Sequence, residues 1–248
     1  MKAVLVTSQV TYIPRNHLAL FEELYASAAP HLAGLVLLDN LSPRLLGAAA
    51  GLCLIGCRGI AGSLARNIFE LPLGRRERIF DRLGLPVIRA KTMNDPKMVD
   101  WVKSNAVDLV INVRTRCIYK SAILNAPRLG CINIHHGLLP EFRGTMCDLY
   151  ALWKNRRAGF TIHVMNEKID AGRILVRQAV SVPGEKDYLQ YLAKTGREEG
   201  SALAMLLQAA ARTGALPDGI PNRCEKPIFT RNPTRDQIRL FRQAGLLL

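Results

Sequence analysis

A glycine-rich phosphate loop is missing from the start of this chain. The first apolar run, Lys2 to Val6, is followed by the turn Thr7 to Val10, which forms neither G-x-G-x-x-G nor G-x-x-x-x-G-K-[ST]. Both patterns place backbone N–H groups around a phosphate at the start of a helix. Their absence argues against a dinucleotide-binding Rossmann site and against a P-loop nucleotidase.

Paired cysteines are lacking as well. None of the six cysteines forms a C-x2-C pair, and Cys53 and Cys57, at a C-x3-C spacing, have no second ligand pair nearby. Structural zinc sites draw four ligands from such pairs, so no metal is expected. No signal-peptide pattern follows Met1. The expectation is a cytoplasmic protein with reduced thiols.

Long apolar runs are few and short. The uncharged run Leu45 to Cys57, between Arg44 and Arg58, is rich in Gly and Ala and too short to span a bilayer. It predicts a buried or interfacial helix. A peripheral membrane contact stays open as an alternative because arginines follow the run at positions 58, 66, 75, 76 and 78.

Charge of one sign dominates. The 34 Lys and Arg residues outnumber the 20 Asp and Glu residues, and the net charge is +14. The excess favours anionic partners such as nucleotide phosphates, tRNA or an acidic surface. It is equally explained by solvated Arg-rich faces, because no run of five or six basic residues marks a nucleic-acid arm.

Short apolar runs alternate with helical segments along the chain. Strands are predicted at Lys2 to Val6, Gly34 to Leu38, Pro86 to Ile88, Asp108 to Val113, Cys131 to His135 and Phe160 to Met165. Helices are predicted at Arg15 to Ala29, Pro96 to Ser104, around Lys120 to Leu124, and from Asp187 to about Arg212. The alternation predicts an α/β fold with a Rossmann-like, doubly wound, mostly parallel sheet.

The predicted domain organisation has two parts. Residues 1–182 form a catalytic domain with a helical insertion at 41–83, and residues 183–248 form a small helical C-terminal extension. In that extension, Thr234 and Gln237 have the spacing of a capping box that opens a last helix through Phe241.

Candidate catalytic residues gather where one strand meets a loop. Asn133 and His135 lie two apart in the strand Cys131 to His135, so their side chains point to the same side. A Pro- and Gly-bearing loop follows, at the edge where open α/β sheets place their sites. Asp170 lies on a later turn beside the sheet. An amide, an imidazole and a carboxylate together can bind an oxyanion and transfer a proton.

These motifs resemble the catalytic domain of the folate-dependent formyltransferases. The resemblance rests on Asn133-Ile134-His135, Leu138-Leu139-Pro140 with Arg143-Gly144, and Ile169-Asp170-Ala171-Gly172, and it covers roughly Gly84 to Val180. It implies transfer of a formyl group from 10-formyltetrahydrofolate to a primary amine. Asn133 and protonated His135 would stabilise the oxyanion, and Asp170 would keep His135 charged.

The resemblance also implies the binding residues. A turn at Arg116, Cys117, Ile118 and Tyr119 and a second wall at Asn166, Glu167 and Lys168 would hold the folate, mostly through their backbone. Arg143, Thr145 and Met146 would face the acceptor. Asp148 would cap a helix or attract a cationic amine. His17, His31 and His163 have no motif around them and are interpreted as structural.

Departures from the family pattern narrow the range of possible formyl acceptors. His136-Gly137 stands where a Pro-Ser pair is common, and the Gly-Ser-Asn turn of the glycinamide ribonucleotide enzymes is missing. About 60 residues after Ser181 are too few for the β-barrel of the initiator-tRNA enzymes. We therefore expect a small-molecule amine, such as a nucleotide-linked amino sugar, and a possible homodimer. A 10-formyltetrahydrofolate hydrolase, a tRNA-borne acceptor and a basic binding protein stay open as alternatives.

Overall fold

A central seven-stranded sheet organises the molecule. The computed structural model describes residues 1–248, apart from the side chains of Pro14, Arg44 and Leu46. The strand order is β3-β2-β1-β4-β5-β7-β8, in which β1 to β5 are parallel and β7 and β8 are antiparallel. The strands are β1 (Ala3–Ser8), β2 (Leu32–Leu38), β3 (Val87–Ala90), β4 (Leu109–Asn112), β5 (Cys131–His135), β7 (Gly159–Val164) and β8 (Ile174–Ala179).

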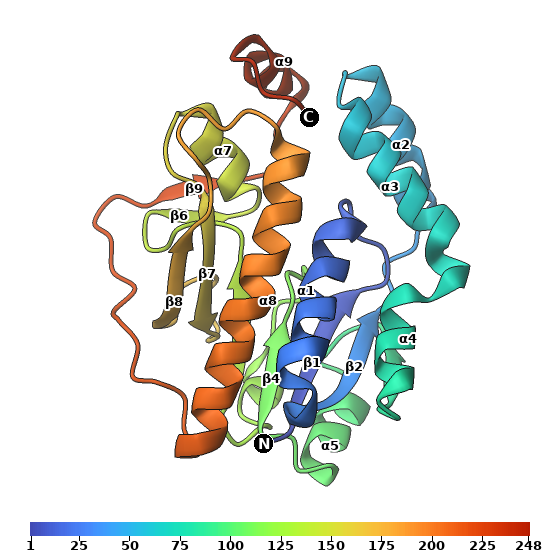
Figure 1. Cartoon of the computed structure of the whole chain (residues 1–248), viewed down its shortest axis with the longest axis vertical. Coiled ribbons are helices and arrows are strands. Elements are labelled where there is room, and N and C mark those ends of the chain that lie inside the picture. The colour runs from blue at the N-terminus through green and yellow to red at the C-terminus, as the bar shows by residue number, and fades with distance from the viewer.

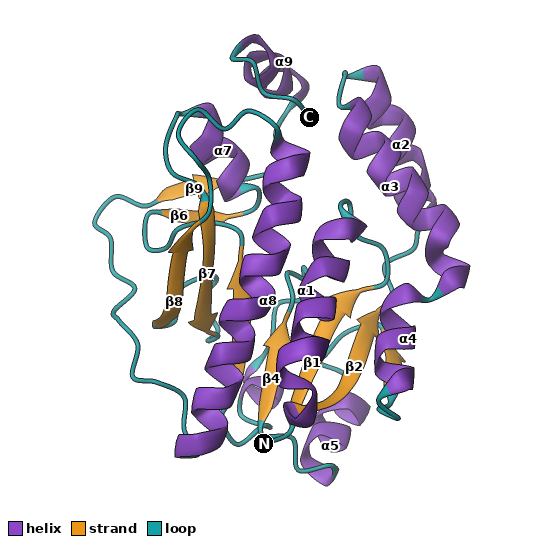
Figure 2. Ribbon diagram, viewed as in Figure 1, coloured by secondary structure: helices purple, strands orange, loops and turns teal.

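Helices cover both faces of this sheet, as Figure 2 shows. Alternate strand residues point to opposite faces and are apolar on both, which is the pattern of a sheet buried between two layers. The helices are α1 (Pro14–Ala28), α2 (Pro43–Leu54), α3 (Arg58–Glu70), α4 (Arg75–Arg82), α5 (Pro96–Ser104), α6 (Ser121–Leu124), α7 (Cys147–Trp153), α8 (Tyr188–Thr213) and α9 (Arg235–Gln243). Leu5 and Ile111 pack in one core with α1 and α8, whereas Val4 and Val110 pack in another with α5.

The doubly wound, mostly parallel sheet predicted from the sequence is confirmed. Each predicted strand and helix has a counterpart, with ends that shift by a few residues. The segment 41–83 holds three helices. The first of them, α2, is helical as expected but half-exposed, since none of its described side chains is fully buried. Its Gly and Ala residues leave little apolar surface to bury.

The C-terminal part of the chain runs along the molecule as α8 and then returns along its side (Figure 1). Helix α8 lies along α1, and its Leu203 and Leu207 belong to the same core as the sheet. The chain then runs back along the side of the molecule to β9 (Ile228–Thr230), which pairs in parallel with β6 (Phe142–Gly144), and ends in α9 (Figure 1). The capping box of Thr234 and Gln237 is confirmed. The boundary at residues 182 and 183 stays a prediction.

Among the residues that the structure describes, no helix is both long and apolar enough to cross a membrane. All six cysteines are free thiols.

Candidate active site

The carboxyl ends of β4 and β5 carry the polar side chains of the site. Asn112 is the last residue of β4, and Asn133 and His135 lie in the last half of β5. The residues of β5 that alternate with them, Ile132 and Ile134, are β-branched, apolar and fully buried, and they fix the strand in the sheet. Alternation then turns both polar side chains to the same side. Asp170 approaches from the turn between β7 and β8, in a left-handed conformation with φ of 50°.

A chain of hydrogen bonds orients the amide of Asn133. Its Oδ1 accepts from Asn112 Nδ2 at 2.9 Å, and Asn112 Oδ1 in turn accepts from Thr115 Oγ1 at 2.7 Å. With its oxygen engaged, Asn133 directs its Nδ2 toward His163 Nε2, 3.2 Å away. An amide nitrogen carries two hydrogens, so the second remains for a ligand oxygen. Asn133 is therefore arranged as a donor.

His135 is a buried imidazole held on two sides. Its Nε2 donates to the carbonyl of Phe142 at 3.0 Å, and its Nδ1 lies 3.6 Å from Asp170 Oδ2. The side chain is 5% exposed. With the hydrogen on Nε2, the basic nitrogen of the neutral ring is Nδ1. The separation from Asp170 exceeds a hydrogen bond, and a proton added at Nδ1 would turn it into a charged pair.

The two members of this pair have shifted pKa values. Burial alone would raise the pKa of Asp170, but the adjacent imidazole of His163, the charge of His135 and the Gly144 N–H at 3.0 Å outweigh it and lower the pKa to about 2. Burial lowers the pKa of His135 below its ordinary value, and Asp170 opposes this without reversing it. His135 is accordingly neutral near pH 7, whereas the sequence-based expectation was a protonated ring.

His163, interpreted as structural from the sequence, belongs to the site. It lies opposite Asn133 in the antiparallel pairing of β5 with β7. Its Nδ1 donates to the carbonyl of Val164 at 2.9 Å, so in the neutral ring Nε2 is free to accept from Asn133, and that atom also lies 3.5 Å from Asp170 Oδ1. The sequence could not indicate this position, because the partner of His163 is across the sheet rather than nearby in sequence.

A second charged cluster lies beside the first and is formed by Arg114, His136, Asp148 and Glu199, here called the buried quartet. His136 Nε2 lies 2.7 Å from Glu199 Oε1 and its Nδ1 3.3 Å from Asp148 Oδ2. Arg114 NH1 lies 3.1 Å from Glu199 Oε2 and also contacts the ring of His136. The side chains of Asp148 and Glu199 are fully buried. The quartet ties β4 and β5 to α7 and α8.

The quartet accounts for the pKa of His136 and for the role of Asp148. Burial lowers the pKa of His136, but Glu199 outweighs burial and the nearby Arg114, and with Asp148 it raises the pKa above the ordinary value. Asp148 does not cap α7, whose N-cap is Met146; its carboxylate instead faces His136 and accepts from Tyr188 Oη at 3.1 Å. The residue that departs from the family pattern is thus the centre of an ionic cluster.

Gly137, the second departure from the family pattern, is required by the position of the His135 ring. A Cβ at this residue would lie 2.6 Å from His135 Nε2 and 2.7 Å from Cys147 Cβ. Both contacts are closer than packing allows, so a serine in this place would displace His135 or α7. His136 and Gly137 therefore form a matched pair in this chain.

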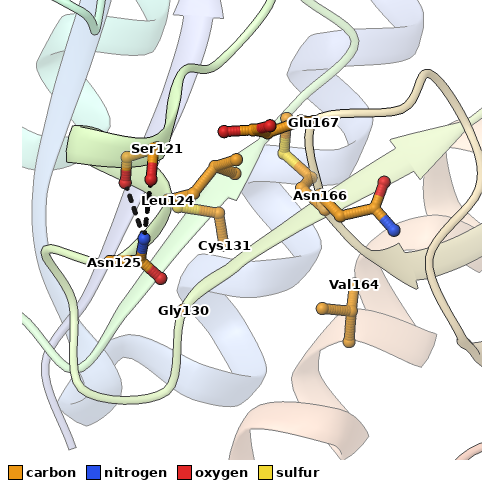
Figure 3. Close-up of a pocket in the computed structure, with 9 residues that line it drawn as sticks. Ser121, Leu124, Asn125, Gly130, Cys131, Val164, Asn166 and Glu167 are labelled. Carbon is orange, nitrogen blue, oxygen red and sulfur yellow. Dashed lines mark hydrogen bonds between the residues drawn. The ribbon is translucent and has the colours of Figure 1, made fainter.

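Two of the predicted folate-binding residues, Asn166 and Glu167, border a cavity of about 400 Å³ near the start of β5 and the end of β7. Figure 3 shows Asn166 and Glu167 on one side and Ser121, Asn125 and Cys131 on the other. This volume is in the range of small-molecule sites. Of the remaining predicted residues, Tyr119 is buried in the core beside Cys131, Cys117 is half-buried, and Arg116, Ile118 and Lys168 are exposed. Their folate-binding role stays a prediction.

The predicted acceptor residues lie on β6 and the turn after it. Arg143 is half-buried, borders a second cavity of about 370 Å³ with Asn222 and Arg223, and donates to Asn222 rather than to Glu141. Thr145 is exposed and its hydroxyl donates to Asn232 at 3.3 Å. Met146 is half-buried in a left-handed conformation with φ of 59°. The structure brings Arg143 and Thr145 into contact with the C-terminal segment, which the sequence did not indicate.

Metal binding has no support among the side chains that the structure describes. They include no group of three or more His, Cys, Asp or Glu arranged to hold an ion.

Comparison with known proteins finds one family. Residues 65–207, more than half of the chain, match the family described as formyl transferase. The methionyl-tRNA formyltransferase of Geobacillus thermodenitrificans (strain NG80-2) is 34% identical over 158 residues, which make up 63% of this chain and 49% of that protein. The chain spans about half the length of the curated relatives it matches.

Solved structures share the fold. The phosphoribosylglycinamide formyltransferase from Anaplasma phagocytophilum aligns with a TM-score of 0.60 and 19% identity over 92% of this chain and 96% of that one. A sugar N-formyltransferase from Shewanella sp FDAARGOS_354 aligns with a TM-score of 0.56 and 20% identity over 97% and 86%. At these identities the similarity extends to the fold alone.

Proposed function

This chain belongs to the formyl transferase family, and on that premise we propose that it moves a formyl group from 10-formyltetrahydrofolate to the primary amine of a small molecule, such as a nucleotide-linked amino sugar. The family uses 10-formyltetrahydrofolate as its donor. The observation that carries the proposal is the meeting of Asn133, His135 and Asp170 at the end of β5. The turn that brings Asp170 also supplies Asn166 and Glu167 to the cavity.

The proposed reaction begins with attack of the neutral amine on the formyl carbon. A C–N bond forms and the carbonyl electron pair moves to the oxygen, which accepts from Asn133 Nδ2. Fixed donors of this kind stabilise the oxyanion, and loss of one costs about 10²- to 10³-fold in rate. Because Asn133 is held by Asn112 and Thr115, it needs little reorientation.

His135 then handles the proton. A neutral ring can accept the proton of the attacking nitrogen at Nδ1, and the resulting cation is stabilised by Asp170, whose low pKa keeps it ionised. When the intermediate collapses, the bond from the formyl carbon to N10 breaks and N10 takes the proton from His135. The products are a formamide and tetrahydrofolate, and the ring is neutral again.

The test is turnover of 10-formyltetrahydrofolate by the whole chain with a panel of amines, including nucleotide-linked amino sugars. Tetrahydrofolate is followed by absorbance and the formamide by mass spectrometry. We expect both products to appear in equal amounts and to need the amine. An unchanged donor with every amine contradicts the proposal, and tetrahydrofolate released without any amine supports the hydrolase alternative.

Formylation of a tRNA-borne amine is the second candidate. Its support is the 34% identity to a methionyl-tRNA formyltransferase, together with the net charge of +14. Binding of an RNA phosphate backbone weakens steeply with salt. Methionyl-tRNA in the same assay, at low and high salt, separates the candidates: a salt-sensitive rate that exceeds the rates with small amines favours this one.

A further inference from the structure

The segment of residues 220–232, here called the C-terminal strap, lies against the candidate active site. After α8 it runs up the side of the molecule and reaches β6 and β9 (Figure 1). Ile220 exchanges backbone hydrogen bonds with Ile174 at 2.8 and 2.9 Å, and Ile228 N donates to the carbonyl of Glu141 at 2.7 Å. The strap thus contacts β8 near one end and the catalytic loop near the other.

Asn222 lies between these two ends of the strap, and both the nitrogen and the oxygen of its side-chain amide make hydrogen bonds. Its Nδ2 donates to the carbonyl of Asp170 at 2.9 Å and to that of Gly172 at 2.8 Å. Its Oδ1 and its backbone carbonyl accept from Arg143 NH2 at 3.3 and 3.2 Å. One side chain therefore connects the turn that carries Asp170 with the strand that carries Arg143.

The same two segments meet at the catalytic carboxylate. Gly144 N donates to Asp170 Oδ2, the oxygen that faces His135. Gly144 has a φ of 100°, and a Cβ there would lie 2.3 Å from the carbonyl of Thr230 on the strap. Asp170 itself has a left-handed backbone, which is unfavourable for a residue other than glycine and persists only when its surroundings hold it. Asn222 supplies such contacts at the backbone carbonyl of Asp170.

We propose that Asn222 is a positioning residue, which fixes the Asp170 turn against β6 so that the carboxylate faces His135. The C-terminal strap is then a part of the catalytic apparatus rather than a covering of it. This inference rests on the proposed function for its kinetic consequences. Its structural consequence, the placement of Asp170 beside His135, can be measured without turnover.

Two variants test the role. Asn222→Ala removes the amide, and Asn222→Asp keeps the size but replaces both donors with oxygen that faces two carbonyls. Misplacement of a reacting group by about 1 Å can cost about 10²-fold in rate. For both variants we expect kcat to fall by about 10-fold or more, with KM for the donor nearly unchanged. Lys226→Ala, an exposed residue of the same strap, is the control and should keep the full rate.

The second readout is the titration of His135 by NMR with labelled histidine. Asp170 raises the pKa of His135, so its withdrawal in the Asn222 variants should lower that pKa further, by about 0.5 to 1 unit. The control should leave it unchanged. An unchanged His135 titration with a lower melting temperature alone overturns the inference, because Asn222 would then be a tether of the strap. A clear NMR shift in a chain without formyl transfer supports the inference and rejects the proposed function.

Discussion

Two adjacent histidines at the end of β5 lie in opposite electrostatic surroundings. His135 faces one carboxylate at 3.6 Å and one carbonyl, and burial lowers its pKa. His136 faces two buried carboxylates, at 2.7 and 3.3 Å, and its pKa is raised. The pKa of one ring is therefore lowered and that of the other is raised, although the two are neighbours in sequence and both largely buried.

The difference follows from what compensates burial on each side. Removal from water disfavours the cation in both rings, and only contacts that favour the cation can restore it. The buried quartet offers His136 two full negative charges, which exceed the effect of Arg114. Asp170 divides its contacts among His135, His163 and Gly144. The charge of His136 itself adds to the lowering at His135. The carboxylate partners of the two histidines thus give them opposite pKa shifts.

The largest effect is expected from His135→Ala, which removes the proton acceptor. Loss of a general acid-base group costs about 10²- to 10⁴-fold in rate. The variant should keep its fold. The measurement is kcat/KM for formyl transfer, with His31→Ala as the control. A His135→Ala variant that retains the rate would reject the mechanism.

Glu199→Ala should act on stability instead. Removal of one member of a buried ion pair leaves its partners uncompensated and costs about 3–5 kcal/mol. Urea unfolding measures it, and Glu198→Ala, whose carboxylate accepts from Gln178 Nε2 at 2.8 Å near the surface, is the matched control. Equal losses for the two variants would show that the quartet gives no special stabilisation.

The free energy of unfolding should depend on the titration of Asp170 at acid pH. Its pKa of about 2 in the fold lies below the ordinary 3.8, so it stabilises the folded state above pH 4 and loses this contribution as the pH falls toward 2. The loss amounts to about 2 kcal/mol. Asp170→Asn should show a flatter decline of unfolding free energy across this window. A decline as steep as that of the unmodified chain would place the titration elsewhere.

The smallest effect is expected at alkaline pH. Because the pKa of His136 is raised above the ordinary 6.5, its contribution to stability is fully present below that pH and is lost as the pH rises through the higher folded value. His136→Gln should remove this dependence as the pH rises above 6.5. Melting temperatures of the two proteins at neutral and alkaline pH test it, and parallel curves would contradict a raised pKa of His136.

Sequence reasoning reached the parallel strands and the placement of Asn133 and His135 on the same side of one strand. Val4, Leu5 and Val6 form an apolar run because both faces of the sheet are covered, and such a run is visible without the fold. Asn133 and His135 were placed together because a strand has a period of two residues. Both inferences need nothing beyond a few neighbouring residues, which is why they agree with the structure.

Contacts between distant segments could not be predicted in this way. His163 reaches Asn133 through strand register, and Glu199 reaches His136 through the packing of α8. The pairing of β6 with β9 joins two three-residue strands separated by more than 80 residues, and neither is long enough to show a period. A signal was present for the quartet in the unusual His136-Gly137 pair, although it did not reveal the partners.

The pairing of β6 with β9 has a consequence for the making of the protein. A chain grows from its N-terminus, and domains begin to fold during synthesis. The seven strands of the sheet, His135 and Asp170 all lie before residue 180. The strand that supports Gly144 and the amide that holds Asp170 come after residue 220. A growing chain can thus form the sheet before the segments that support Gly144 and Asp170 have been made.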